Sequence, residues 1–91
     1  VSSYSCLARL YVAVDDIQQK RLDSAAAHAQ ATIANVSPDA EVSWEREVYW
    51  SGRYLQGLLL AGKGDPAGAV QMAEARKKSH LWPIVDGLAV P

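Results

Sequence analysis

The stretch Gly62-Lys63-Gly64-Asp65-Pro66 limits what this chain can fold into more than any other part of the sequence. Two glycines flank a lysine, and an aspartate and a proline follow at once, so no helix or strand is expected to continue through it. A glycine just past a helix can adopt the left-handed conformation that closes the helix. Asp65 can cap the following helix, and Pro66 suits its first turn. The stretch therefore predicts a turn between two helices.

The same region comes close to a nucleotide-binding motif. Residues 57–64 read GLLLAGKG, one residue short of the phosphate-binding loop G-x-x-x-x-G-K-[ST], whose last hydroxyl holds Mg²⁺. Gly64 stands where that hydroxyl is needed, and the three leucines and one alanine between the glycines favour a helix. A chain of 91 residues also offers no series of strand–helix repeats to carry such a loop. We expect the end of a helix here; a nucleotide-binding module that uses Gly57–Gly64 is the disfavoured alternative.

Apolar residues recur at helical spacing in the first half of the chain. One stripe consists of Leu7, Leu10, Tyr11, Val14 and Ile17. A second stripe consists of Leu22, Ala25, Ala26, Ala29, Ile33 and Val36. No glycine or proline marks the boundary between them, and Asp23 or Ser24 is available to cap the second helix. Ser37-Pro38-Asp39 is expected to begin the next helix, with Ser37 as its cap and Pro38 in its first turn.

The segment 41–50, EVSWEREVYW, fits two periods. The alternation typical of a strand runs through Val42, Trp44, Val48 and Trp50. A helical stripe runs through Trp44, Val48, Leu55, Leu59 and Gly62. The three glutamates of the segment favour a helix over a strand, so a helix is predicted.

The second half of the chain predicts two more helices. The helix after the turn is expected to end at Arg76-Lys77-Lys78, where positive charge suits the negative pole of the helix dipole. Its inward face is expected to consist of Ala69, Val70, Ala73 and the stem of Arg76. The final stretch LWPIVDGLAV then predicts a short cap helix over about 81–90.

The sequence therefore predicts a single all-α domain over residues 1–91. It is expected to contain one antiparallel hairpin over about 4–36 and a second over about 38–79, followed by the cap helix. Turn residues and apolar periodicity agree across most of the chain, which is stronger evidence than either alone.

The stretch YLQGLLLAGKGDPAGAVQMAEAR resembles a tetratricopeptide repeat. Gly57, Gly64-Asp65 and Ala69 stand where that repeat has its helix glycine, its turn and the alanine at which its two helices pack, and Val70 fits the aliphatic neighbour. The residues that depart from the repeat are Arg53, Gln56, Leu60 and Arg76. RLDSAAAHAQATIANVSP resembles the second helix of another repeat, although Ala25 and Ala69 are farther apart than the roughly 34-residue period.

The resemblance implies a short right-handed superhelix that acts as a protein- or peptide-binding scaffold without catalysis. By position, Tyr54, Leu58 and Ala61 would face its concave groove, with Trp50 and Arg53 just upstream. Aromatic residues at helical spacing such as Trp50 and Tyr54 are more often core residues, and Arg53 is more often solvated or paired with Glu45 and Glu47 nearby. Two repeats are fewer than the three or so usually needed for stability, which predicts self-association, flanking repeats or cover from the terminal helix. A structural homo-oligomerisation domain is the alternative function.

A second resemblance is local. Trp50-Ser51-Gly52 resembles the W-x-G motif of small helical-hairpin secretion substrates, in which the tripeptide forms the turn. In this chain the clear turn lies at Gly62–Pro66, which disfavours that interpretation.

The remaining composition indicates neither catalysis nor a cofactor. His28 and His80 are far apart, so no metal site is expected, and Asp15-Asp16 should diverge on a helix rather than form an acid–base pair. Nothing in the sequence assembles a nucleophile, a base and an oxyanion donor. We therefore expect no catalytic residues, no metal ligands and no cofactor.

The net charge and the hydropathy of the sequence limit the classes of partner that this chain is expected to bind. The net charge of −1, from nine basic and ten acidic residues, favours neither nucleic acid nor an acidic membrane, and no apolar run approaches a membrane span of about 20 residues. Cys6 is the only cysteine, which is typical of a reducing, cytoplasmic compartment. The chain lacks an initiator methionine, so flanking sequence is expected to be missing.

Overall fold

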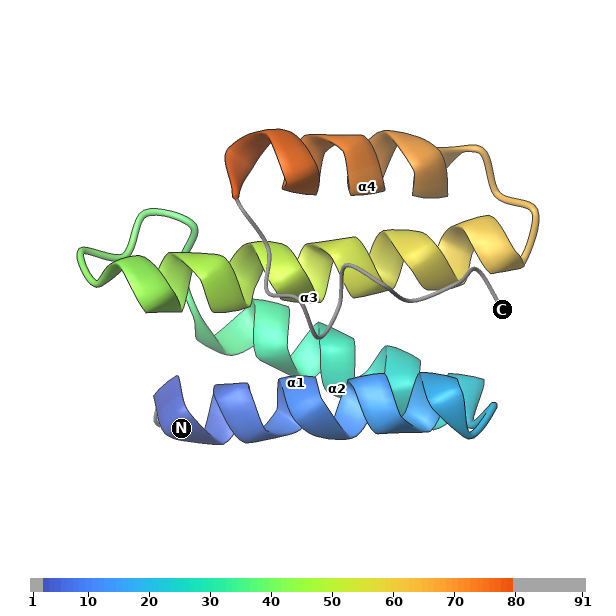
Figure 1. The fold of residues 1–91 in the computed structure, drawn as a ribbon, viewed down its shortest axis with the longest axis horizontal. Coiled ribbons are helices and arrows are strands. Elements are labelled where there is room, and N and C mark those ends of the chain that lie inside the picture. Colours follow the sequence, from blue (N-terminus) through green and yellow to red (C-terminus); the bar gives the residue numbers. More distant parts are fainter. Residues whose placement is uncertain (1–2, 80–91) are drawn as a thin grey trace.

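The computed structural model describes residues 3–79 as four helices in two antiparallel hairpins (Figure 1). The helices are α1 (Ser3–Gln18), α2 (Leu22–Asn35), α3 (Ser43–Gly62) and α4 (Ala67–Lys78). The all-α prediction is confirmed for this part of the chain, and so is the helix predicted within 41–50. The predicted cap helix over 81–90 lies outside the described residues.

Helix α3 is the central element, because it packs against α4, α2 and α1 (Figure 1). Leu55 and Leu58 of α3 and Leu10 of α1 are fully buried side chains of the core. The buried cluster consists of Leu10, Ala13, Val14, Ile17, Ala25, Ala29, Tyr54, Leu55, Leu58, Leu59 and Ala75. Half of the inward face of α1 and α2 is alanine or another small side chain, so the helices approach closely with little buried area per residue.

The inward face of α1 differs from the prediction at one position. Tyr11 was expected on the apolar stripe, but its side chain is 49% exposed. Cys6 and Ala13 are fully buried on that face with Leu10. Tyr11 follows Leu10 in the sequence, so its side chain lies about 100° further around the helix. The small side chains of Cys6 and Ala13 let α1 lie close to its neighbours, and the Tyr11 ring stays outside this contact.

Helices α3 and α4 touch through their backbones. A Cβ atom built on Gly68 would lie 2.4 Å from the nitrogen of Ala61 and 2.5 Å from the carbonyl oxygen of Gly57. A Cβ atom on Gly57 would lie 2.8 Å from the carbonyl oxygen of Gly68. Contacts this short do not occur for real Cβ atoms, so only glycine fits either position. The two glycines therefore fix how closely α4 lies on α3.

This contact shifts the register of α4 by one residue from the prediction. Ala69, Val70 and Ala73 were expected to point inward, but all three are exposed, Val70 by 72%. The buried positions of α4 are Gly68 and Ala75. Gly68 faces α3 because it has no side chain, which lets the two helix backbones approach closely. Ala69 also stands at the alanine position of the tetratricopeptide repeat that this stretch resembles, but in this chain the preceding glycine makes the contact.

Two of the helices end in the same hydrogen-bonded turn. After α3, Gly64 has a φ of +84°, its N–H donates to the carbonyl of Ala61 at 3.0 Å, and the N–H of Asp65 donates to the carbonyl of Leu60 at 3.0 Å. These two bonds define a Schellman motif, whose left-handed residue is usually glycine. Asp65 then accepts a hydrogen bond at Oδ1 from the N–H of Ala67 at 2.9 Å, so its side chain satisfies the first backbone donor of α4. Pro66, which was expected in the first turn, directly precedes Ala67, the first residue of the helix.

The boundary that the sequence left undefined, between α1 and α2, uses the same motif with a lysine. Lys20 has a φ of +65°, its N–H donates to the carbonyl of Ile17 at 3.1 Å, and the N–H of Arg21 donates to the carbonyl of Asp16 at 2.8 Å. A residue with a Cβ atom in this conformation costs roughly 1–2 kcal/mol. The turn therefore forms without the glycine that usually signals it.

The connection between the hairpins is longer than predicted. Ser37 and Pro38 were expected to begin a helix, but α3 begins at Ser43. The hydroxyl of Ser37 accepts a hydrogen bond from the N–H of Asp39 at 3.0 Å, and the chain forms a local turn there. A serine side chain bonded two residues ahead stabilises a turn as readily as a helix start, and the sequence pattern does not distinguish the two.

We predict that Gly68→Ala lowers the free energy of unfolding by about 1–3 kcal/mol, because the new methyl group would clash with backbone atoms of α3 that cannot rotate away. Urea denaturation measures the change. Gly52→Ala is the matched control, since its Cβ atom would meet only side-chain atoms of α2, at 3.3 Å. Alanine is the better helix former, so a Gly68→Ala variant as stable as the wild type would show that the backbone contact is absent.

We also predict that Lys20→Gly raises the free energy of unfolding by about 0.5–1 kcal/mol, because glycine adopts a positive φ without the Cβ clash. Lys20→Ala keeps the Cβ atom and should give no such gain. Chemical denaturation of both variants at one pH separates the backbone effect from loss of the lysine charge. A gain of equal size in Lys20→Ala would assign the effect to charge instead.

Candidate functional site

A basic pocket lies at the corner where α4 ends beside the first turns of α3. Its volume is about 400 Å³. Its basic lining residues are Arg46, Arg76, Lys77 and Lys78, and the others are Ser43, Glu47 and Ser79. We call this site the corner pocket.

The corner pocket arises because the two arms of the second hairpin differ in length. Helix α3 has 20 residues and α4 has 12, a difference of eight residues that amounts to about 12 Å of helix. The larger part of this excess lies at the start of α3, which projects past the last turn of α4 (Figure 1). The unequal lengths of α3 and α4 therefore create the corner in which the pocket lies.

The charge of the corner pocket is opposite to that of the whole chain. Four of the nine basic residues of the sequence line it, together with one carboxylate, that of Glu47. The net charge of the chain is −1. Because charges beyond about 8 Å are screened at physiological ionic strength, a group entering the pocket experiences the local excess of positive charge.

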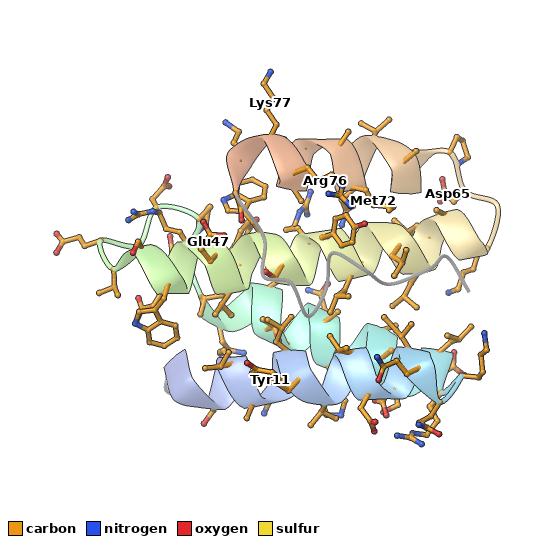
Figure 2. All side chains as sticks on the ribbon, in the orientation of Figure 1. Tyr11, Glu47, Asp65, Met72, Arg76 and Lys77 are labelled. Carbon is orange, nitrogen blue, oxygen red and sulfur yellow. The ribbon has the colours of Figure 1, made fainter. Side chains whose placement is uncertain are left out.

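Arg76 is held in place by Tyr54. Its Nη2 donates a hydrogen bond to the phenol oxygen of Tyr54 at 2.9 Å, and its guanidinium carbon lies 4.9 Å from the centre of the same ring. The Tyr54 side chain is buried in the core, so the ring is a rigid support. Arg76 therefore points toward α3, whereas Lys77 points away from it (Figure 2).

Two further residues of the corner pocket join α3 to other parts of the chain, one to the segment before α3 and one to the residue that follows α4. Nη1 of Arg46 donates hydrogen bonds to the carbonyl oxygens of Ala40 and, at 3.0 Å, of Glu41. The carboxylate of Glu47 accepts a hydrogen bond from the hydroxyl of Ser79. The walls of the corner pocket are thus tied to each other by side chains, which reduces the ordering that binding would require.

The five residues predicted to bind a partner fall into two groups. Tyr54 and Leu58 are buried, at 2% and 0% exposure, so the prediction that they line an open groove is wrong. Both belong to the core because α3 is packed on several sides, and Tyr54 instead supports Arg76. Trp50, Arg53 and Ala61 are partly exposed, and their predicted binding role stays a prediction.

Arg53 and Trp50 have defined neighbours. Nη2 of Arg53 lies 3.6 Å from Oε1 of Glu74 on α4, so its carboxylate partner comes from the opposite helix rather than from the nearby glutamates of α3. Trp50 packs against the core cluster and makes an edge-to-face contact with Tyr49, with ring centres 4.9 Å apart. Trp50-Ser51-Gly52 lies inside α3, so this tripeptide forms no turn.

Sequence reasoning missed the corner pocket. It treated Arg76-Lys77-Lys78 only as a favourable helix end, and they do occupy the last turn of α4. The signal available was the unequal length of the two predicted arms on either side of the Gly62–Pro66 turn. The placement of Arg46 beside the basic run depends on tertiary packing.

The acidic pair Asp15-Asp16 converges on one cation instead of diverging. Arg21 donates from Nε to Oδ1 of Asp16 and from Nη2 to Oδ2 of Asp15, both at 2.8 Å, and the hydroxyl of Ser24 donates to Oδ2 of Asp16 at 2.6 Å. The Ser24 hydroxyl and then the Arg21 guanidinium hold the pKa of Asp16 below its usual value of 3.8. Hydrogen bonding to Asp16 likewise raises the pKa of Arg21. Asp23 or Ser24 was expected to cap α2, but the helix already begins at Leu22 and its first turn has no side-chain cap. The Ser24 hydroxyl donates to Asp16 instead.

Other candidate chemistries find little support in the described residues. Gly57–Gly62 is helical, so the backbone N–H groups there are engaged within α3 and do not form a phosphate loop. No group of three or more metal-ligating side chains occurs between residues 3 and 79. Within the same range, no helix has the length and apolar character to cross a membrane.

We predict that the stabilisation of the wild type relative to Asp16→Asn depends on pH. A carboxylate whose pKa is lowered on folding stabilises the fold above its unfolded-state pKa, and that contribution is lost as the pH falls through the lower folded-state pKa. The difference in free energy of unfolding should therefore be constant from pH 7 to about 5 and shrink below about pH 4.

Denaturation midpoints between pH 7 and pH 2 provide the measurement for this prediction. In Ser24→Ala, the loss of the hydroxyl should raise the pKa of Asp16 and move the decline to higher pH. A difference between wild type and Asp16→Asn that stays unchanged down to pH 2 would contradict the role given to Asp16.

Comparison of the chain with protein-family models, curated proteins and solved structures finds no significant match.

Proposed function

We propose that this domain is a protein- or peptide-binding scaffold of the helical-repeat type, and that the corner pocket receives an acidic part of its partner. The two hairpins would act as a short right-handed superhelix like that of tetratricopeptide repeats. No catalytic step is part of the proposal.

The observation that carries the proposal is the fixed arginine of the corner pocket. Arg76 is bonded to a buried tyrosine at 2.9 Å, in a pocket where Arg46 and Lys78 face a single carboxylate. Arginine is enriched among the residues that dominate binding energy, and a side chain fixed before binding loses less entropy. A carboxylate entering the corner pocket would be attracted by the excess positive charge.

The role of the hairpins is support. The backbone contact at Gly57 and Gly68 and the packing of Ala75 hold α4 on α3, which places the basic run beside the start of α3. Such a site needs no movement of the helices to accept an extended segment. The proposed domain therefore binds as a rigid body.

A peptide-display selection on the immobilised wild-type domain tests this proposal. We expect the selected peptides to be enriched in Asp and Glu and to bind at least about tenfold more weakly to Lys78→Glu, in which a cation of the corner pocket is reversed. Lys63→Glu is the matched control, because Lys63 lies at the opposite end of the same hairpin. Binding to Lys63→Glu should equal that to the wild type.

The salt dependence of the same peptides provides an independent check. Their affinity should fall as ionic strength rises from about 0.05 to 0.5 M, since the attraction is between exposed charges. Selected peptides that lack acidic residues, or that bind equally well to Lys78→Glu, would overturn the assignment of the corner pocket.

A further inference from the structure

We propose that the corner pocket recognises the phosphate monoester of a phosphorylated side chain on the partner. This inference rests on the proposed function, because it names the chemical group that the corner pocket would select. The charge, the hydrogen-bond donors and the volume of the corner pocket all suit such a group.

The charge balance of the corner pocket exceeds what a carboxylate can neutralise. Because Lys77 points away from α3, three basic side chains, those of Arg46, Arg76 and Lys78, are set against Glu47, an excess of two positive charges. The start of α3 contributes about +0.5 and the end of α4 about −0.5, so the two helix termini cancel and the side chains decide the sign. A carboxylate would supply one negative charge, whereas a phosphate monoester supplies about 1.5 to 2 at pH 7.

The donors of the corner pocket also suit a phosphate. Two of its cations are guanidinium groups, those of Arg46 and Arg76, and this planar fork matches phosphate oxygens. Lys78 adds a point charge, and its side chain makes no hydrogen bond or ion pair within the described part of the chain. A phosphate presents three acceptor oxygens, so it can engage donors from both α3 and α4 at once.

The volume permits more than a bare anion. At about 400 Å³, the corner pocket lies near the lower end of the range of about 300–1,000 Å³ that small-molecule sites occupy. It can therefore admit a phosphorylated side chain together with part of the adjoining peptide. The additional peptide contact is what distinguishes a phosphorylated partner from free phosphate.

The probes are three versions of one pentapeptide, Gly-Gly-X-Gly-Gly, in which X is phosphoserine, glutamate or serine, together with inorganic phosphate. Amide chemical shifts of the ¹⁵N-labelled domain are followed by NMR during titration. We expect the phosphoserine peptide to shift the amides of residues 43–47 and 76–79, with an affinity about five- to tenfold above those of the glutamate peptide and of inorganic phosphate. The serine peptide should cause no shifts.

Variants locate the binding site. Lys78→Gln should weaken the phosphoserine peptide several-fold, and Lys63→Gln, at the far end of the hairpin, should leave its affinity unchanged. Circular dichroism of each variant confirms that it is folded. Shifts that persist unchanged in Lys78→Gln would overturn the assignment to the corner pocket.

The outcomes separate this inference from the function on which it rests. A glutamate peptide that binds as tightly as the phosphoserine peptide overturns the phosphate preference and supports the acidic-peptide function. Inorganic phosphate that binds as tightly as the phosphopeptide overturns the phosphorylated partner, because the peptide then contributes nothing. If neither acidic peptide shifts the amides of the corner pocket, both proposals fail.

Discussion

The backbone contact between Gly57 and Gly68 sets the distance and the register of α4 on α3, and the other features of the second hairpin depend on it. With Gly68 against α3, Ala75 is buried two turns later and Arg76 reaches the ring of Tyr54. A shift of α4 by one residue would rotate each of its side chains by about 100°. Arg76 would then no longer contact Tyr54, and the corner pocket would lose the guanidinium group that this contact holds in place. Packing at one crossing point therefore determines the chemistry of a site more than a turn away.

The first hairpin is held differently, by charge at its turn rather than by glycine at its crossing. Arg21 joins Asp15 and Asp16, and Ser24 completes the network around the buried carboxylate. These bonds lie beside the left-handed Lys20, so they help to hold a turn that carries a backbone cost. Each hairpin thus has its own means of fixing its two helices, and α3 joins the hairpins by packing on both.

Much of the helix content could be predicted from the sequence, because glycine, aspartate and proline at 62–66 and the apolar periodicity are local signals. The turn at Lys20 could not, since a lysine in the left-handed conformation has no sequence signature. The start of α3 was placed too early because the Ser37 turn looks like a helix cap. The register of α4 and the burial of Tyr54 depend on which residues meet across two helices. The corner pocket, for the same reason, required the tertiary structure.

The difference in length between α3 and α4 separates the site from the core. The glycine contact and the buried alanine belong to the part of the hairpin where the two helices run side by side, whereas the corner pocket lies where α4 ends and α3 continues past it. Substitutions or small changes of length at the end of α4 could therefore reshape the site while the packing of the hairpin stays the same. A candidate site built in this way can change its side chains at little cost in stability, much as an exposed loop does on a rigid scaffold.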